Sequence, residues 1–516
     1  MIVPGRAAPF PRAGLATPHY LASAAGAAVF ARGGNAVDAL VGANLALGVV
    51  APYYCGYGGD IFAIVWDGEL HGYLGSGRSP AAATIDAVRD ALGDTPLLIG
   101  PHSVTVPGAV AGWFELLDRW GTMSFGELAR DAIRYAREGF EITPLAAAAA
   151  QGYRGFYRGF HEWQAVYGGL DVGDVLVQEP LARLIELLAA DGPDAYYRGP
   201  VAESIAAAVG RYGGCMTRDD LAAHAGQWDA PLRARYRDAE VAELGPPTQG
   251  AAVLEILRIL EGFDPRAMDA GERAHVAVEA VKLGLRDRDD HLSDPDHMTI
   301  AASDLFADDW VARRRDAIDP DRAGVPAPGH PQRGGTAYLC AADDGLYVSL
   351  IQSNFLSFGS GVHVPEWGIN LNNRGSSFAL DASRVNALAP SKRPMHTLIP
   401  AMVLRDGRPD LVFGSMGGDA QAQVHAQVLT AVVDDGTDPQ AAIDAPRWRV
   451  EPWDWRVRVE ADMDPAVVAA LENNGHQLVE VVARDVGMGH AHAIAIGRPG
   501  FAVATDPRAE GAAVGS

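Results

Sequence analysis

The sequence has few cysteines and few basic residues for its length, and both shortages narrow what the protein can be. Cys55, Cys215 and Cys340 are the only three cysteines among 516 residues, which is too few for a disulfide framework. Such usage is typical of a reducing compartment. Lys and Arg number 42 against 65 Asp and Glu, giving a formal net charge of −23. We therefore expect no nucleic acid or anionic membrane as a partner, because both repel an acidic surface.

The sequence also lacks a hydrophobic run long enough to cross a bilayer. The longest run, Ala36 to Val50, contains Asp38 and Asn44 and is shorter than the ~20 residues that a spanning helix needs. The N-terminal residues lack the charged, apolar and small-residue order of a secretory signal. These features predict a cytoplasmic protein in which 36–50 form a buried helix.

What the sequence does contain is a helix-rich first two-thirds, a loose joint and a strand-rich last third. The joint, 319–335, is rich in proline and glycine and has no periodicity. Helical spacing of apolar residues extends over 21–32, 35–50, 112–120, 124–139, 180–191, 201–212, 250–262 and 274–292. Strands are predicted at 61–66, 336–342, 346–353, 396–404, 411–414 and 490–496. This organisation predicts an α+β protein.

A threonine lies where the loose joint meets the first of the later strands. Thr336 follows Gly334 and Gly335 and opens an apolar run that ends at Ala342. Asp-Gly then separates this run from a second one, which is a strong hairpin signal. Thr336 is therefore predicted at a loop-to-strand junction.

Position alone gives this threonine one route to reactivity. A hydroxyl is a weak nucleophile without a base, and no G-x-S-x-G signature surrounds Thr336. If the bond after Gly335 is cut, the new α-amino group, with a pKa of roughly 7.7–8.0, can act as that base. Gly334 and Gly335 would permit the strained turn that such a cut requires. On this stretch alone, an ordinary strand start explains the residues better.

Motifs elsewhere in the chain decide between these two interpretations. In order, they include RGGNAVDALVGANLALGVVAPYYCGYGGD at 32–60, SVTVPGAVAGW from 103, GPPTQGAAVLEILRILEGFD from 245, EAVKLGLRDRDDHLSDPD from 279, LNNRGSSF, NALAPSKRPMHTLIP and GSMGGDAQ. Together they resemble the γ-glutamyltransferase (γ-glutamyltranspeptidase) family of N-terminal-nucleophile hydrolases, over nearly the whole chain.

The resemblance implies a four-layer αββα fold that is made as one precursor and cuts itself between Gly335 and Thr336. The large subunit would be residues 1–335, ending in a mobile pre-cleavage loop at 317–335. The small subunit would be residues 336–516, and both would build one domain. The resemblance implies no cofactor and no metal, and a homo-oligomer is compatible with it.

The family's catalytic positions carry suitable residues here. The resemblance implies that Thr336 is the nucleophile and that Ser353 is the hydroxyl that hydrogen-bonds it. Gly417 and Gly418 lie between the strand predicted at 411–414 and a helix predicted at 421–433, where backbone N–H groups can stabilise a developing oxyanion.

The positions that hold a γ-glutamyl donor depart from the family pattern. Ser76 stands where the family has its carboxylate-binding arginine, and Arg78 lies two residues later. The residues after Asn372-Asn373 are Arg374, Gly375, Ser376 and Ser377 in place of the acidic residues that hold an α-amino group. His396-Thr397 replaces a pair of serines, and Phe355 replaces an asparagine.

These replacements remove an acceptor for ammonium and add a guanidinium, which suits a bidentate grip on a carboxylate. We therefore predict a small anionic amide donor, bound by Arg78, Arg374, Ser377, His396 and Thr397. The acyl group would form an acyl-enzyme on Thr336 and pass to water or an amine. This is similar to the family branch that includes oxamate amidohydrolase. A surface ion pair explains Arg374 equally well.

Three alternatives remain open from the sequence. The first is an oxamate- or glutaryl-amide hydrolase without the γ-glutamyl activity of glutathione metabolism. The second is a catalytically eroded binding protein on the same fold. The third is a metal site at His490 and His492, which alternate on a predicted strand; no further ligand has a matching spacing, so core or surface histidines are favoured.

Overall fold

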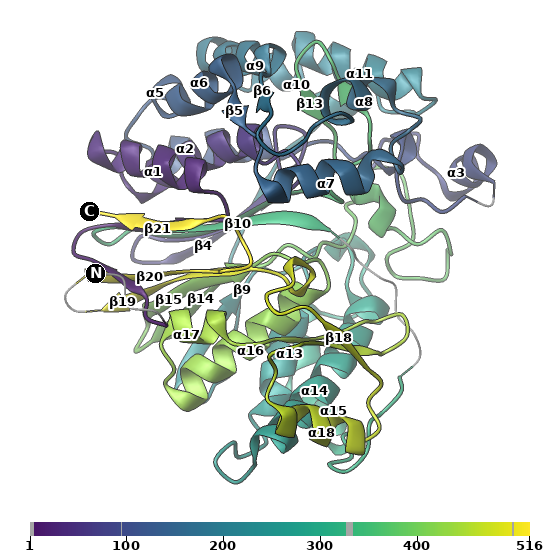
Figure 1. The fold of residues 1–516 in the computed structure, drawn as a ribbon. Helices are drawn as coiled ribbons and strands as arrows, with labels where there is room; N and C mark the ends of the chain where they lie inside the picture. The colour runs from purple at the N-terminus through teal and green to yellow at the C-terminus, as the bar shows by residue number, and fades with distance from the viewer. Residues whose placement is uncertain (1–4, 94, 327–333, 498–499) are drawn as a thin grey trace.

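Two sheets lie face to face at the centre of the structure, and a layer of helices covers the outer face of each (Figure 1). The computed structural model describes residues 5–93, 95–326, 334–497 and 500–516. The first seven-stranded sheet has the order β21 (Ala512–Gly515), β2 (Gly14–Thr17), β10 (Gly335–Ala342), β11 (Tyr347–Phe355), β3 (Asp60–Trp66), β4 (Leu70–Gly75) and β7 (Gln227–Asp229). The second has the order β1 (Ala8–Phe10), β20 (Gly500–Thr505), β19 (Ala491–Gly497), β15 (Arg408–Ser415), β14 (Pro400–Arg405), β9 (Ala239–Glu243) and β8 (Leu232–Tyr236). The expected αββα fold is confirmed.

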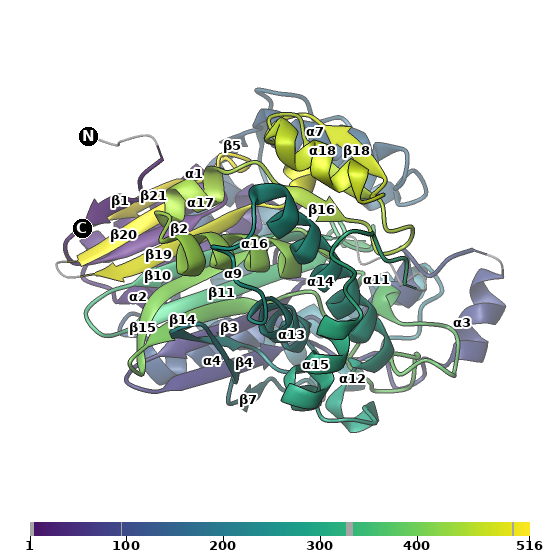
Figure 2. The ribbon, with the colours of Figure 1, turned by 90° about the horizontal axis from the view of Figure 1, so that it is seen from below.

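The helices on the first sheet come from the N-terminal part of the chain, and those on the second from the middle and the end. The former are drawn from α1 (Tyr20–Ala31), α2 (Ala36–Val50), α3 (Ile85–Leu92), α4 (Ala109–Trp120), α5 (Phe125–Leu128), α6 (Arg130–Glu138), α7 (Pro144–Arg154), α8 (His161–Tyr167), α9 (Glu179–Asp191), α10 (Asp194–Tyr197), α11 (Pro200–Arg211) and α12 (Arg218–Ala222). The latter are drawn from α13 (Gly250–Leu260), α14 (Ala270–His291), α15 (Asp308–Asp316), α16 (Ala420–Asp435), α17 (Pro439–Asp444) and α18 (Pro465–Asn473). Seen from below, α13, α14 and α16 lie across the second sheet (Figure 2). Within the described ranges, no helix combines the length and the apolar character needed to cross a membrane.

Among the residues that the structure describes, three small sheets lie outside the two central ones. Their strands are β16 (Trp448–Val450), β17 (Val457–Glu460) and β18 (Leu478–Val481), then β12 (His363–Val364) with β13 (Ile369–Asn370), and β5 (Phe140–Glu141) with β6 (Val175–Leu176). The pairing of β17 with β18 is parallel.

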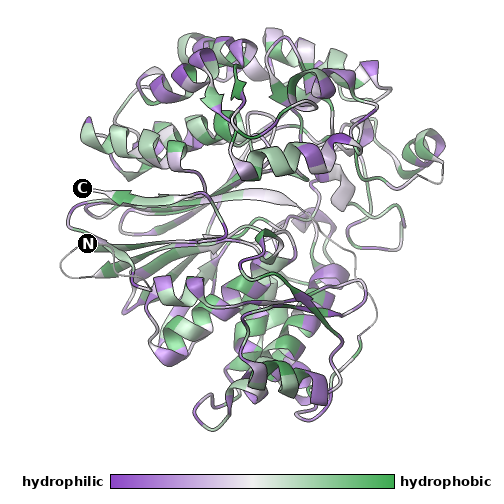
Figure 3. Ribbon diagram, in the orientation of Figure 1, coloured by the Kyte–Doolittle hydropathy of each residue, from purple (hydrophilic) through white to green (hydrophobic). Residues whose placement is uncertain are grey.

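Four layers produce three interfaces, and each interface has its own hydrophobic core. Leu339 packs in the core between the first sheet and its helices, whereas its neighbour Tyr338 packs between the two sheets. Val281 and Phe413 belong to the third core, between the second sheet and its helices. Because β10 is buried on both faces, its sequence is a continuous apolar run. Hydrophobic residues accordingly concentrate in the sheets and adjoining helices (Figure 3).

Residues 1–335 and 336–516 interleave rather than forming separate domains. The first sheet places β10 and β11 between β2 and β3, and the second places β14 next to β9. Each sheet therefore needs strands from both sides of Thr336. A cut before Thr336 would leave two polypeptides, and both would contribute residues to each of the main hydrophobic cores.

The predicted pre-cleavage loop is described only in part. Ala323 N–H donates to Asn474 O at 2.7 Å, and Trp455 Nε1 donates to Pro326 O at 2.7 Å, so the part before residue 327 is tied to the later half of the chain. Residues 327–333, on which the rest of the prediction falls, lie outside the described residues.

Several elements have bounds that differ from those predicted: α4, α14 and β15 each begin three or four residues earlier than expected. The helix expected over 124–139 is two helices, α5 and α6, joined at Ala129. The strand expected from 396 begins at Pro400, because the backbone N–H of His396 donates to Pro247 O at 2.7 Å, outside the sheet.

Candidate active site

Thr336 lies at an irregularity in the pairing of β10 with β11. Gly335 pairs with Phe355 and Ala337 pairs with Gln352, so two residues of β11, Ser353 and Asn354, stand opposite one threonine. A bulge of this kind re-aims side chains and is common beside active sites. Here it lies on the peptide bond that was predicted to be cut.

The hydroxyl of Ser353 connects the threonine to the carbonyl before it. Thr336 Oγ1 donates to Ser353 Oγ at 3.3 Å, and Ser353 Oγ donates to Gly335 O at 2.6 Å. The N–H of Phe355 donates to the same Ser353 oxygen at 2.7 Å, which fixes its orientation. The structure thus brings together Thr336, Ser353 and the carbonyl that Thr336 would attack.

Gly334 and Gly335 are needed here for close backbone approach, which corrects the reason given from the sequence. Neither has a φ in the left-handed region. A Cβ on Gly335 would lie 2.7 Å from Tyr53 O, and one on Gly334 would lie 2.9 Å from Phe355 O. Both contacts involve backbone that a side chain could not displace cheaply.

The second glycine pair forms the turn between β15 and α16. Gly417 has φ 137° and Gly418 has φ 60°, so both adopt conformations that favour glycine. Neither backbone N–H donates to an acceptor within the described residues. Gly417 lines the same pocket as Gly335, which places this turn beside the predicted cut.

A buried polar network, not found from the sequence, holds that turn in place. Arg288 Nη1 donates to Asp419 Oδ1 at 2.6 Å and to Gln249 Oε1 at 2.9 Å. Gln249 Nε2 donates in turn to Thr397 O at 2.8 Å. The glycine turn and the 396–397 segment are therefore fixed relative to each other.

Arg374 is fully buried, so the alternative of an ion pair at the surface is wrong: its acidic partner, Asp60, is buried with it. Its Nε lies 3.4 Å from Asp60 Oδ2, and both side chains are 0% exposed. Both Nη atoms are buried without a hydrogen-bond partner among the described residues. Burial lowers the pKa of Arg374 to about 10, which leaves it cationic at neutral pH. Two unpartnered donors on one cation are costly unless something anionic binds them.

Phe355 lies at the site, although the sequence showed only that it replaces an asparagine of the family pattern and assigned it no role. Its φ is 74°, which is unusual for a bulky side chain. Its ring lies against Arg374, with the guanidinium carbon 4.1 Å from the ring centroid. Phe355 therefore shields the cation from solvent and joins it to the strand of Ser353.

Three other predicted binding residues also carry buried polar atoms without partners in the described part of the chain. These atoms are both ring nitrogens of His396, Thr397 Oγ1 and Ser377 Oγ. Burial, with Arg374 and Arg393 nearby, lowers the pKa of His396 well below its usual range. A neutral imidazole can donate from one nitrogen and accept at the other.

Arg78 is placed differently from the other predicted residues. It donates to Asp294 Oδ2 at 3.1 Å and to Ser391 O at 2.9 Å. With Ser76 and Arg393 it lines a separate pocket of about 340 Å³, which Thr336 does not line. Of the two candidate arginines, Arg374 has the stronger link to Thr336.

His490 and His492 are buried core histidines. His490 Nε2 lies 3.1 Å from Tyr54 Oη, and His492 Nδ1 lies 3.1 Å from Thr505 Oγ1. Burial lowers the pKa of His490 to about 3 and that of His492 to about 4.

A different cluster has the residue types of a metal site. His275, Glu279 and His476 place ligand atoms within 4.8 Å of one another. Lys282 Nζ, however, lies 2.8 Å from Glu279 Oε1 and 3.3 Å from His476 Nδ1. A protein ammonium group therefore already occupies the cation position of this cluster.

The four layers, with a buried threonine hydroxyl that Ser353 links to the carbonyl oxygen of the preceding peptide, define an N-terminal-nucleophile hydrolase, an enzyme that acts on amide bonds. A family description of γ-glutamyltranspeptidases matches residues 22–516, and the chain belongs to this family. The alternative of a binding protein without catalytic activity is therefore set aside.

Several relatives are similar over almost their whole length. The chain is 37% identical to the glutathione hydrolase-like YwrD proenzyme of Bacillus subtilis, over 97% of both chains. It is 36% identical to the oxamate amidohydrolase proenzyme of Klebsiella pneumoniae, over 96% of this chain and 97% of the other. The crystal structure of cephalosporin acylase from Bacillus halodurans matches with a TM-score of 0.94 at 35% identity, covering 100% of this chain and 98% of the other.

Proposed function

We propose that this protein is a self-processing threonine amidohydrolase or acyltransferase that takes a small anionic amide donor without need of an α-amino group. The observation that carries the proposal is the buried Arg374, whose two Nη atoms have no partner among the described residues. A carboxylate on the donor would accept from both Nη atoms, a bidentate geometry to which guanidinium is suited. Water or an amine would receive the acyl group.

Processing would begin with attack of Thr336 Oγ1 on the carbonyl carbon of Gly335. Ser353 Oγ donates to that carbonyl oxygen at 2.6 Å and would stabilise the negative charge that develops there. The C–N bond then breaks, the acyl group moves to Oγ1, and the Thr336 nitrogen becomes an amine. Water hydrolyses this ester and releases Gly335 as a carboxylate.

Turnover would use the freed α-amine as the general base. The amine takes the proton from Thr336 Oγ1 as the oxygen attacks the donor carbonyl. The N–H groups of Gly417 and Gly418 would hold the oxyanion, and the α-ammonium group would return its proton to the leaving amine. Water, deprotonated by the same α-amine, would then attack the acyl-enzyme. The ester bond would break, and the proton would return to Thr336 Oγ1.

The activities after which two relatives are named support an amide donor with an anionic acyl part. One relative is an oxamate amidohydrolase proenzyme, and another is a glutathione hydrolase-like proenzyme. The word proenzyme in both names agrees with self-processing. The choice between a γ-glutamyl donor and a donor without the α-amino group then depends on the residues around Arg374.

The donor specificity can be tested by comparing a γ-L-glutamyl anilide with its glutaryl analogue and with an oxalyl anilide. We expect kcat/KM for the better des-amino donor to equal or exceed that for the γ-glutamyl donor, because Arg374 stands where an ammonium group would need a carboxylate. Arg374→Ala should lower kcat/KM for the anionic donors by about 10- to 100-fold, the value of a charge-assisted hydrogen bond of roughly 1.5–3 kcal/mol.

Two controls keep this specificity test decisive. Arg374→Ala alone leaves the carboxylate of Asp60 buried without its cation, so Asp60→Asn/Arg374→Ala is measured as well. Arg78→Ala removes a guanidinium from the separate pocket and should leave the donor preference unchanged. A clear preference for the γ-glutamyl anilide that persists without Arg374 would contradict the proposal.

The pH dependence of anion binding provides an independent test of the same site. Burial raises the pKa of Asp60 to about 6, against the opposing effect of Arg374. Above this pH the ionised Asp60 offsets the charge of Arg374, and below it the neutral acid does not. The inhibition constant of glutarate should therefore fall about tenfold from pH 8 to pH 5. This is the change expected when binding of the anion shifts the pKa of Asp60 by about one unit. Asp60→Asn should bind glutarate tightly at both pH values, and an unchanged pH profile in this variant would contradict the assignment.

A further inference from the structure

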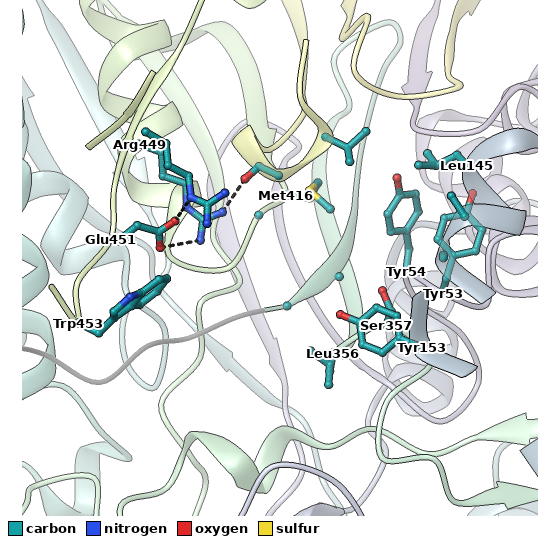
Figure 4. Close-up of a pocket in the computed structure, with 18 residues that line it drawn as sticks. Tyr53, Tyr54, Leu145, Tyr153, Leu356, Ser357, Met416, Arg449, Glu451 and Trp453 are labelled. Atoms are coloured by element: carbon teal, nitrogen blue, oxygen red, sulfur yellow. Dashed lines mark hydrogen bonds and ion pairs between the residues drawn. The ribbon is translucent and has the colours of Figure 1, made fainter. Parts of the chain in front are cut away.

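A pocket of about 470 Å³ opens beside Gly335. Gly335 and Gly417 both line it, so it touches the predicted cut on one side and the glycine turn on the other. Its remaining walls come from distant parts of the chain and include Tyr53, Tyr54, Tyr153, Arg449, Glu451, Trp453 and Arg458 (Figure 4).

This pocket lies apart from the residues proposed to hold the acyl group. Arg374, His396 and Thr397 do not line it, whereas Gly335 and Gly417 do. A donor whose acyl end reaches Arg374 and whose carbonyl lies at Thr336 must direct its amine part elsewhere. The pocket that adjoins the reacting bond without containing Arg374 is the space that can receive it.

The pocket walls combine aromatic rings with an excess of positive charge. Tyr53 and Tyr54 have ring centroids 4.4 Å apart and lie, with Tyr153, across the pocket from Trp453 (Figure 4). Flat rings on two sides favour a flat, apolar guest through stacking.

The positive charge comes from two arginines that share one carboxylate. Glu451 lies 2.5 Å from Arg458 Nε and 3.6 Å from Arg449 Nη2, and its side chain is only 3% exposed. Arg449 also donates to Gly487 O at 2.5 Å, and its Nε is buried without a hydrogen-bond partner among the described residues. One cation therefore remains uncompensated at a wall that a ligand can reach.

We propose that this pocket binds the amine part of the amide donor, and that it selects a flat or aromatic amine that carries a carboxylate. The inference rests on the proposed function in that Arg374 takes the acyl end. When Thr336 Oγ1 attacks, the C–N bond breaks and the amine leaves with the proton from the α-ammonium group. Its carboxylate stays bound to Arg458 and Arg449 and takes no part in the chemistry. By microscopic reversibility the same pocket positions an amine acceptor.

The test measures binding of free amines to the processed protein by calorimetry, so that it does not depend on turnover. The two probes are 4-aminobenzoate and its neutral isostere 4-aminobenzamide. We expect 4-aminobenzoate to bind at least about tenfold more tightly. Arg458→Gln should remove that difference, and Arg449→Gln should reduce it. Arg456→Gln is the matched control, because Arg456 precedes β17, pairs with Asp454 and does not line the pocket.

Competition with glutarate separates this pocket from the acyl site. Binding of 4-aminobenzoate should persist with saturating glutarate and in Asp60→Asn/Arg374→Ala. Equal affinity for the two probes, a preference retained in Arg458→Gln, or displacement by glutarate would each overturn the inference. Failure of the donor test at Arg374 would leave these binding results unchanged, so the two proposals fail separately.

Discussion

Replacing Thr336 with alanine is expected to leave one full-length chain without amidase activity. Wild-type protein should separate on a denaturing gel into pieces of 335 and 181 residues, because Ser353 connects Thr336 Oγ1 to the carbonyl of the bond between Gly335 and Thr336. The variant loses the nucleophile for both processing and turnover, so kcat should fall by about 10⁴-fold or more. Intact-mass spectrometry gives the position of the cut to the residue. An intact chain with full activity, or a cut at another bond, would show that Thr336 is not the nucleophile.

Variants at neighbouring hydroxyls separate the chemistry from simple disruption. Thr336→Ser keeps a hydroxyl beside the nascent amine and should still cut itself. Ser353→Ala removes the 2.6 Å donor to Gly335 O, so processing should slow by about 10- to 100-fold. Ser349→Ala is the matched control, since Ser349 is also buried on β11 but bonds to Tyr338 and to Ala401. Equal processing rates for the two serine variants would exclude Ser353 from the cleavage step.

The strands that carry the nucleophile could be predicted because their signals are local. The apolar run after Thr336, the Asp-Gly turn and the run after it specify a hairpin without reference to the rest of the chain. The bulge opposite Thr336 could not be predicted in this way. Whether Ser353 and Asn354 together face one residue depends on strand register, which is set by packing of the whole sheet.

The binding residues were harder to place because their environment comes from distant parts of the sequence. Arg374 is buried against Asp60, 314 residues away, and sequence alone could not distinguish this pairing from a surface ion pair. Arg288 and Gln249, which hold the glycine turn, lie 131 and 169 residues from their partners in it. Only the glycines themselves gave a local signal. The left-handed φ of Phe355 likewise could not be predicted, because phenylalanine does not favour this conformation.

Placing a side chain on Gly418 should slow turnover while leaving the fold in place. The residue has φ 60°, so Gly418→Val costs about 1–2 kcal/mol of backbone strain and moves or crowds its N–H group. If that N–H holds the oxyanion, kcat should fall by about 10²–10³-fold, with little change in KM. Processing should continue, because Ser353 and not the glycine turn donates to Gly335 O.

Gly436 provides the control that separates strain from catalysis. It ends α16, the same helix that Gly418 precedes, and its φ of 64° is almost the same. A Cβ there would meet nothing within 4 Å. Gly436→Val should therefore lower Tm about as much as Gly418→Val and leave kcat unchanged, since only Gly418 belongs to the turn whose Gly417 shares a pocket with Gly335. Rates are measured on fully processed protein, and Tm by calorimetry. If both variants lose the same fraction of kcat, the loss reflects strain alone and the oxyanion is held elsewhere.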